Sequence, residues 1–469
     1  MSFISDNFLL ETDEAAMLYH EYAAHLPIID YHNHLSPKEL ATNHRFETIT
    51  EAWLQHDHYK WRAMRAMGIE ENYITGSAAD LEKFQKWAGI APYTIRNPLF
   101  HWTQLELKRY FNIDSMLSST NAETIYQETT VQLQSPSHSA LGLLNMMKVE
   151  VVCTTDDPID NLEYHQKLRG MALKLQMRPT FRPDKAYAIA NPEAFKIYLE
   201  KLESASDRSI NTYADLLDAL EDRISFFHDN QCRVADHGLE YLGYFESPPC
   251  DIEVLFSRIL EGRVPTSEEV HYFQFHTLSL LCPSYHKRGW VQQFHLGALR
   301  NTNLRMFDKL GADAGFDSIG DFAQAQGLAK FLSLLDSSDQ LAKTILYNLN
   351  PSWNEVFATM AGNFNGHGIK GKVQFGSGWW YNDQLNGMEK QLNVLSSMGM
   401  LSCFVGMLTD SRSLLSFPRH EYFRRLLCNI LGKEIKRGLL PNDMNHIGTI
   451  VQDICYFNAK SYFDFKHIK

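Results

Sequence analysis

LPIIDYHNH (residues 26–34) is a short apolar run that ends in a tyrosine and two histidines. Seven later stretches have the same design, in which residue types favoured in buried strands are followed by polar or ionisable ones. They are VEVVCTTDD (149–157), MRPTFRPD (177–184), CRVADHG (232–238), VQQFHLGA (291–298), KTILYNLNP (343–351), GKVQFGSGWW (371–380) and LSCFVGMLTDSR (401–412). Amphipathic segments of helical length, such as NPEAFKIYLEKLES (191–204), lie between them. The sequence therefore alternates strands and helices.

This alternation predicts an α/β fold with a parallel sheet, because parallel neighbours are joined by helical crossovers. Eight such units predict a (β/α)8 TIM-type barrel. In that fold the active site is built from residues at the C-terminal ends of the strands. The ends of the eight predicted strands carry His32, His34, Asp156, Arg182, Asp236, His237, His295, Trp379, Trp380, Asp410 and Arg412. We therefore expect one polar site at that end of the barrel.

The interval between the first two predicted strands, residues 35–148, is far too long for a loop. Its apolar residues recur at three- and four-residue spacing, which predicts helices. We expect a large helical insertion that caps the mouth of the barrel, within one decorated domain spanning residues 1–469. The connection 237–290 is also predicted to be mostly helical.

Composition excludes several classes of protein. The 469 residues are 44% hydrophobic and 12% aromatic, which is typical of a globular protein with a large core. The net charge of −12 opposes broad binding to nucleic acid or to an anionic membrane. The seven cysteines form no C-x-x-C pair, and neither a signal peptide nor a run of 18 apolar residues is evident. We expect a soluble cytoplasmic protein; a homo-oligomer is compatible with this composition.

His32 and His34 form the strongest local chemical signal. Residues i and i+2 of a strand face the same side, so both imidazoles would point into the barrel mouth and bind one divalent ion. Asp410, at the end of the last predicted strand, would supply an oxygen ligand. The alternative is that the two histidines lie in a surface loop without any metal.

Three arginines, Arg182, Arg300 and Arg412, lie just past predicted strand ends. A guanidinium group grips a planar carboxylate well, so three of them in an acidic protein favour an anionic substrate. Salt bridges within the loops are the alternative for each. Trp379 follows the flexible segment Gly376–Gly378, where an indole would cover the apolar face of a sugar.

Seven motifs together resemble the uronate isomerases, the glucuronate isomerase family of the amidohydrolase superfamily. They occur in the order of that family and cover essentially the whole chain: DYHNHLSP, DHYKWRAMRAMG, TFRPD, VADHG, FHLGALRNTN, GSGWWYND and LTDSR. The resemblance implies an aldose–ketose isomerase for hexuronate sugar acids. It would interconvert D-glucuronate with D-fructuronate, and D-galacturonate with D-tagaturonate, by proton transfer through an enediol.

The resemblance also implies roles for individual residues. Asp410 and Tyr59 are the candidates for proton transfer, and Arg412 and His295 complete the catalytic group. One divalent ion, with zinc as the first choice, would be held by His32, His34 and Asp410, and the sequence leaves open whether turnover needs it. Substrate would be bound by Arg182, Asp236, Arg300, Trp379 and His58.

Two other functions remain open at this point. A metal-dependent hydrolase of the same superfamily commonly binds two ions through a lysine on the fourth strand and histidines on the fifth and sixth. Here the fourth predicted strand ends in Asp236 and His237, and the sixth ends in Asn348 without a histidine. The ligands therefore suffice for one ion. The second alternative is a non-enzymatic protein that binds a sugar acid.

Overall fold

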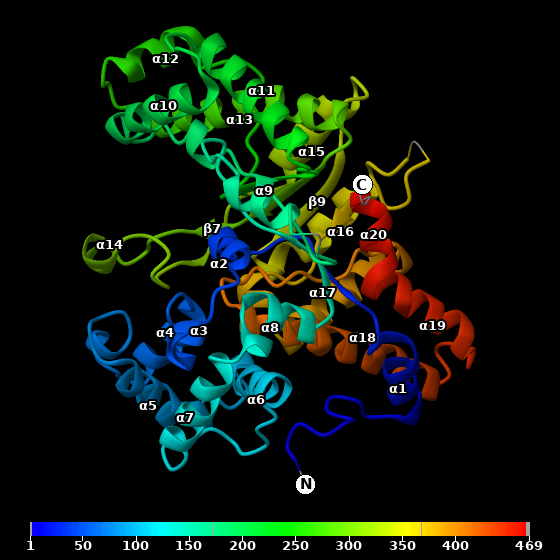
Figure 1. Cartoon of the computed structure of the whole chain (residues 1–469). Helices are drawn as coiled ribbons and strands as arrows, with labels where there is room; N and C mark the ends of the chain where they lie inside the picture. Colours follow the sequence, from blue (N-terminus) through cyan, green and yellow to red (C-terminus); the bar gives the residue numbers. More distant parts are fainter. Residues whose placement is uncertain (1, 172, 367, 466–469) are drawn as a thin grey trace.

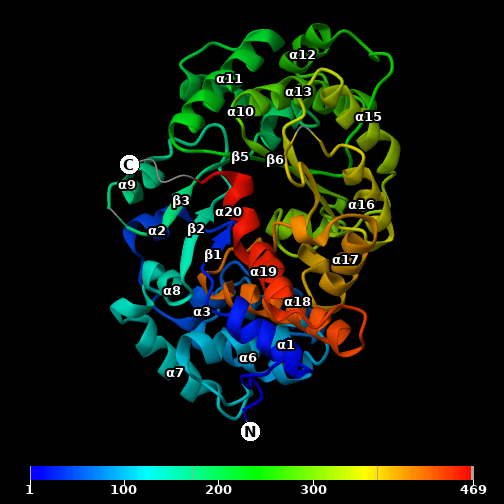
Figure 2. The same ribbon diagram turned by 90° about the vertical axis from the view of Figure 1, so that its right-hand side faces the viewer.

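Eight strands of the computed structural model, which describes residues 2–171, 173–366 and 368–465, form two parallel sheets. The strand order is β1-β2-β3 in the first sheet, whose three strands are labelled in Figure 2, and β10-β9-β6-β5-β4 in the second. The strands are β1 (Ile28–Asp30), β2 (Val149–Cys153), β3 (Gln176–Arg178), β4 (Thr180–Phe181), β5 (Val234–Leu239), β6 (Val291–Leu296), β9 (Lys343–Asn348) and β10 (Val373–Phe375). The α/β class and the parallel pairing predicted from the sequence are confirmed.

The two sheets meet within the third predicted stretch. Pro179, which has no N–H to donate, separates β3 from β4. The chain that follows β2 pairs with both sides of Pro179, because Thr154 N donates to Arg178 O and Asp156 N donates to Thr180 O. We therefore regard β3 and β4 as one interrupted strand, which lies at the edge of both sheets.

The eighth predicted strand, within 401–412, is wrong as secondary structure. A 3₁₀ turn, Leu401–Cys403, is followed by chain without strand pairing. Two left-handed residues interrupt its extended course, Gly406 at φ 80° and Asp410 at φ 47°. The segment still lies beside the end of β1, because Asp410 N donates to His32 O and His34 N donates to Ser411 O. Within the described residues the hydrogen-bonded strands do not close into a barrel.

Residues 35–148, coloured blue to cyan in Figure 1, contain seven α-helices. Local sequence signals set their ends: Asp57 caps α4 through the amides of Tyr59 and Lys60, and Asn97 with Pro98 begins α6. The helices are α2 (Pro37–Thr42), α3 (Ile49–Leu54), α4 (His58–Ala66), α5 (Asp80–Ile90), α6 (Pro98–Phe111), α7 (Ala122–Leu133) and α8 (Ala140–Met146).

The remaining helices cover the sheets and extend from them (Figure 1). The 237–290 connection contains α12 and α13, as expected. These helices are α1 (Asp13–Met17), α9 (Glu163–Arg169), α10 (Pro192–Ser206), α11 (Tyr213–Asp229), α12 (Ile252–Leu260), α13 (Ser267–Lys287), α15 (Ala325–Asp336), α16 (Asn354–Gly362), α17 (Leu385–Met398), α18 (Pro418–Lys436), α19 (Met444–Gln452) and α20 (Asn458–Phe463). No helix in the described ranges is long and apolar enough to cross a membrane.

The structure of residues 297–320 was not predicted from the sequence. Residues 297–320 leave the sheet after β6, form the antiparallel pair β7 (Ala298–Leu299) and β8 (Ser318–Ile319), and carry α14 (Leu304–Leu310) between them. We call this segment the 297–320 excursion. It projects beside the helical insertion (Figure 1).

Candidate active site

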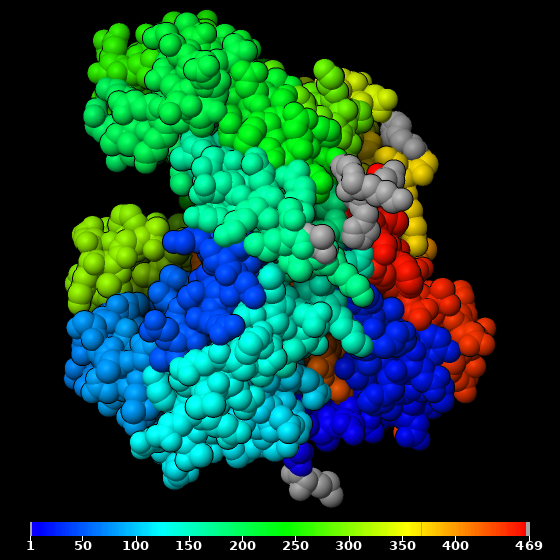
Figure 3. All heavy atoms as spheres, viewed as in Figure 1, coloured from blue at the N-terminus to red at the C-terminus, as the bar shows by residue number. Residues whose placement is uncertain are grey.

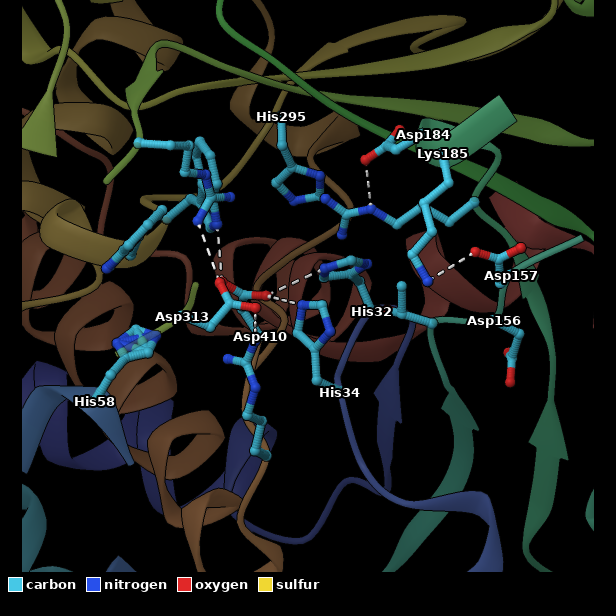
Figure 4. Close-up of a pocket in the computed structure, with 16 residues that line it drawn as sticks. His32, His34, His58, Asp156, Asp157, Asp184, Lys185, His295, Asp313 and Asp410 are labelled. Carbon is cyan, nitrogen blue, oxygen red and sulfur yellow. Dashed lines mark hydrogen bonds and ion pairs between the residues drawn. The ribbon is translucent and has the colours of Figure 1, made fainter. Parts of the chain in front are cut away.

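A cavity of about 320 Å³ lies where the carboxyl ends of the strands meet (Figure 4). Eleven of the residues predicted from the sequence to form the site line it: His32, His34, His58, Asp156, Arg182, His295, Arg300, Trp379, Trp380, Asp410 and Arg412. These residues come from the loops after β1, β2, β4 and β10, from α4, β6 and the 297–320 excursion, and from the end of the eighth stretch. The structure thus brings together residues that are up to 380 positions apart.

His32, His34 and Asp410 converge on one point (Figure 4). Oδ1 of Asp410 lies 3.2 Å from Nε2 of His32 and 3.1 Å from Nε2 of His34. Trp379 Nε1 donates to Oδ2 of the same carboxylate at 2.8 Å. Burial alone would raise the pKa of Asp410, but the hydrogen bonds with both histidines hold it well below its usual range. Asp410 is therefore a carboxylate.

A second group shares His32. Asp236, within β5, accepts from Nδ1 of His295 at 2.7 Å, and its other oxygen lies 3.8 Å from Nδ1 of His32. Each of the two groups, His32–His34–Asp410 and His32–Asp236–His295, has donor atoms within 4.8 Å of one another. Neutral imidazole nitrogens and carboxylate oxygens are ligands that zinc and similar divalent ions prefer.

Two of the candidate ligands, His34 and His295, are in a state suited to bind an ion. Burial opposes the charge on His32, but the carboxylates of Asp236 and Asp410 raise its pKa above the usual value, so an ion there would replace a proton. Burial lowers the pKa of His34 to about 4, so this ring is neutral near pH 7. The bond to Asp236 places the proton of His295 on Nδ1, which leaves Nε2 with a free lone pair. That nitrogen is buried and has no hydrogen-bond partner in the described chain. The residues present thus fit a divalent ion.

Arg182 links two of the recognised motifs. Its Nε donates to Asp184 at 2.8 Å and its Nη1 lies 3.0 Å from Asp236. Gly238 leaves space for the guanidinium group, since a Cβ there would lie 2.3 Å from Nη2. Asp184 also accepts from the Gly238 amide at 3.1 Å. Residues of TFRPD and VADHG therefore pack together around Arg182.

Two further arginines lie at the opposite side of the cavity. The guanidinium of Arg300 lies over the ring of Trp380 at 4.6 Å, and its Nη1 is 3.3 Å from Asp317. Nη2 of Arg412 lies 3.5 Å from Asp313, a residue of the 297–320 excursion. The cavity is thus lined by three guanidinium groups, in a chain whose overall charge is negative.

Tyr59, Asp236 and His237 do not line the main cavity. Tyr59 follows His58 in α4, stacks on it at 4.8 Å, and packs against Trp102 and Arg419. Burial and the nearby Asp410 raise the pKa of Tyr59 well above its usual value, so its hydroxyl stays protonated. Asp236 is fully buried beneath the cavity and contacts it through Arg182 and His295.

Comparison with known proteins agrees with the resemblance described from the sequence. The family model described as glucuronate isomerase matches residues 1–463. The chain is 56% identical over 464 residues to a uronate isomerase of Flavobacterium johnsoniae, covering 99% of both chains. It is 51% identical over 466 residues to one of Bacteroides thetaiotaomicron, covering 99% of this chain and all of that one. The chain belongs to the glucuronate isomerase family.

The fold is that of the family as well. The crystal structure of a uronate isomerase from Thermotoga maritima superposes with a TM-score of 0.92 at 34% identity, covering 99% of this chain and all of the other. The insertion 35–148 and the long 237–290 connection are therefore included in the shared architecture.

Sequence reasoning missed several residues that line the cavity: Thr155, Asp157, Asp184, Lys185 and Asp313. Asp184 belongs to the quoted TFRPD motif, so its position two residues after Arg182 was an available signal. Lys185 pairs with Asp157 at 3.1 Å across the loops after β4 and β2. Asp313 offered no signal, because the excursion that carries it does not end a strand of either parallel sheet.

Proposed function

We propose that this chain is a uronate isomerase that interconverts D-glucuronate with D-fructuronate and D-galacturonate with D-tagaturonate. The observation that carries the proposal is the cavity itself, where guanidinium groups for a carboxylate surround a cluster of imidazoles and an ionised aspartate. Membership of the glucuronate isomerase family supports the proposal. Neutral aldohexoses would be poor substrates because they cannot satisfy the arginines.

The reaction moves one hydrogen from C2 of the aldose to C1 and shifts a proton between the two oxygens. An enediol intermediate requires a proton acceptor at C2, a donor at C1 and stabilisation of charge on the oxygens. In the proposal Asp410 and Tyr59 carry out proton transfer, with Tyr59 as the donor because its hydroxyl stays protonated. Arg412 orients the substrate beside Asp410.

His295 competes with Asp410 for the role of acceptor. Both oxygens of Asp410 are engaged, one by His32 and His34 and the other by Trp379. Nε2 of His295, in contrast, has no partner within the described residues. Comparing Asp410→Asn with His295→Asn distinguishes the two, because only the substitution of the true acceptor abolishes exchange of the C2 hydrogen with solvent.

A divalent ion, zinc in the first instance, would be held by His32, His34 and Asp410. When bound, such an ion stabilises negative charge on the sugar oxygens. Asp236 then acts on the site indirectly, because it holds the His295 ring and the Arg182 guanidinium in place. Arg182, Arg300, Trp379 and His58 would contact the substrate.

The sheets support a distorted (β/α)8 barrel as the finer description of the fold. The backbone bonds from His32 and His34 to residues 410–411, and the bridge between Asp156 and Phe181, are the contacts that would close it. The insertion 35–148 would act as its cap, within one domain. Seven free cysteines favour a reducing, cytoplasmic location.

The experiment that tests the function is an assay with purified protein and four sugars. D-glucuronate and D-galacturonate should form ketoses, whereas D-glucose and D-galactose should not. Turnover of the neutral sugars at a comparable rate would contradict the proposal.

A further inference from the structure

Asp313 occupies the space between two arginines of the cavity. Its Oδ2 lies 3.5 Å from Nη2 of Arg412, and its Oδ1 lies 3.7 Å from Nη1 of Arg300. Each oxygen thus faces a different guanidinium group, as the carboxylate of a bound ligand would. All three residues line the cavity, and Figure 4 shows Asp313 on the same side as His58.

Arg182 is the least available of the arginines for an external carboxylate. It already pairs with Asp184 at 2.8 Å and with the fully buried Asp236 at 3.0 Å. A third carboxylate would meet the repulsion of these two. An anionic ligand is therefore better bound elsewhere in the cavity.

Arg412 is the arginine whose charge is least compensated. Arg300 retains Asp317, which is buried and 3.3 Å away. Within the described residues Asp313 is the only carboxylate within 4 Å of the Arg412 guanidinium. If Asp313 moves aside, Arg412 becomes free to bind a carboxylate, with Arg300 next to it.

The contacts of Asp313 are weak enough to be displaced. Its side chain is 59% exposed, and both distances exceed the roughly 2.7–2.9 Å of a strong charge-assisted hydrogen bond. Exposed ion pairs of this kind contribute little to stability. A ligand carboxylate that is also held by other contacts would compete with Asp313 successfully.

The backbone around Asp313 is held firmly from the other side. Arg65 donates to the carbonyl of Ala314, and Arg62 donates to the carbonyls of Gly315 and Asp317. These arginines belong to α4, which also carries His58 and Tyr59. Figure 3 shows the yellow-green excursion directly against the blue insertion. Only the side chain of Asp313 therefore needs to rotate.

We propose that Asp313 is an internal occupant of the carboxylate subsite formed by Arg412 and Arg300. It neutralises these arginines in the free protein and is displaced by the carboxylate of the substrate. The identity of that substrate rests on the proposed function, but the competition itself does not. Asp313 thus sets how tightly the site binds any singly charged sugar acid.

The test measures binding rather than turnover. D-gluconate, a sugar acid that lacks the aldehyde needed for isomerisation, is titrated into wild type and Asp313→Asn by calorimetry. The Kd should fall about two- to fivefold in the variant, because one competing carboxylate is gone. Asp308→Asn removes the same charge from an exposed position of the excursion and should leave the Kd unchanged.

A double variant identifies the arginine involved. In an Arg412→Met background, Asp313→Asn should no longer improve gluconate binding, and the neutral polyol D-glucitol should be unaffected in every variant. Unchanged or weaker binding of gluconate to Asp313→Asn overturns the proposal, as does an equal gain from Asp308→Asn. A protein that shows the gain but does not isomerise uronates would instead refute only the proposed function.

Discussion

A methyl group at Gly238 would lie 2.3 Å from Nη2 of Arg182 and 3.2 Å from Oδ2 of Asp184. Because Gly238 in β5 has no side chain, Arg182 from the loop after β4 can reach the buried Asp236. The backbone of Gly238 has an ordinary φ, so the requirement for glycine is one of space.

Gly238→Ala should therefore displace the Arg182 side chain while the fold is retained, because the clashing atom is the end of a flexible side chain. We expect kcat/KM for glucuronate to fall roughly tenfold or more through loss of charge-assisted contacts. Gly362→Ala is the matched control, since nothing lies within 4 Å of its Cβ position. Unaltered kinetics of Gly238→Ala would refute the role of this packing.

Removal of one candidate ligand should weaken metal binding. His32→Ala, His34→Ala and Asp410→Ala should each lower the content of divalent ion, because each leaves the site underfilled. Elemental analysis after dialysis measures this directly. His44→Ala, which changes a partly exposed histidine paired with Glu51, should retain the ion. Full occupancy in all three ligand variants would show that the ion binds elsewhere.

Arg412→Met should selectively impair binding of carboxylates. Loss of a charge-assisted and bidentate contact costs roughly 2–4 kcal/mol, which corresponds to a large rise in KM for both uronates. Arg305→Met, at an exposed position in α14, removes the same charge and should have no such effect. Equal effects of the two substitutions would mean that only net charge matters.

Asp156 gives the stability of the protein a pH dependence. Burial raises its pKa to about 7, although Thr154 and the amide of Thr180 donate to the carboxyl group. The folded protein then binds this proton more tightly than the unfolded chain does. The contribution of Asp156 to the free energy of unfolding therefore decreases as the pH rises from about 4 to about 7, and it is constant above pH 7. The free energy of unfolding of Asp156→Asn, relative to wild type, should rise over that interval. A pH-independent difference would contradict the shift.

Much of the architecture follows from local pattern. Apolar runs mark the seven stretches that contain strands, and caps such as Asp57 and Asn97 mark helix starts. The eighth stretch has the same apolar pattern, but the left-handed conformations of Gly406 and Asp410 prevent regular pairing. Hydrophobic pattern does not encode backbone dihedral angles, so this departure could not be predicted.

The sequence predicts those residues of the site that lie at the ends of predicted strands. His32, His34, Asp410 and His295 follow from that rule and are brought together. Asp313 is different, because the excursion that carries it is positioned by Arg62 and Arg65 of the insertion. Such long-range contacts between irregular segments leave no periodic trace in the sequence.

We propose that hydrogen moves between C2 and C1 as a proton. The direct measurement is turnover of D-glucuronate in heavy water, followed by NMR of the D-fructuronate formed. Proton transfer through an enediol predicts solvent deuterium at C1 of the ketose. A ketose that carries no deuterium after prolonged equilibration would contradict the proposal, because the hydrogen would then have moved directly as a hydride.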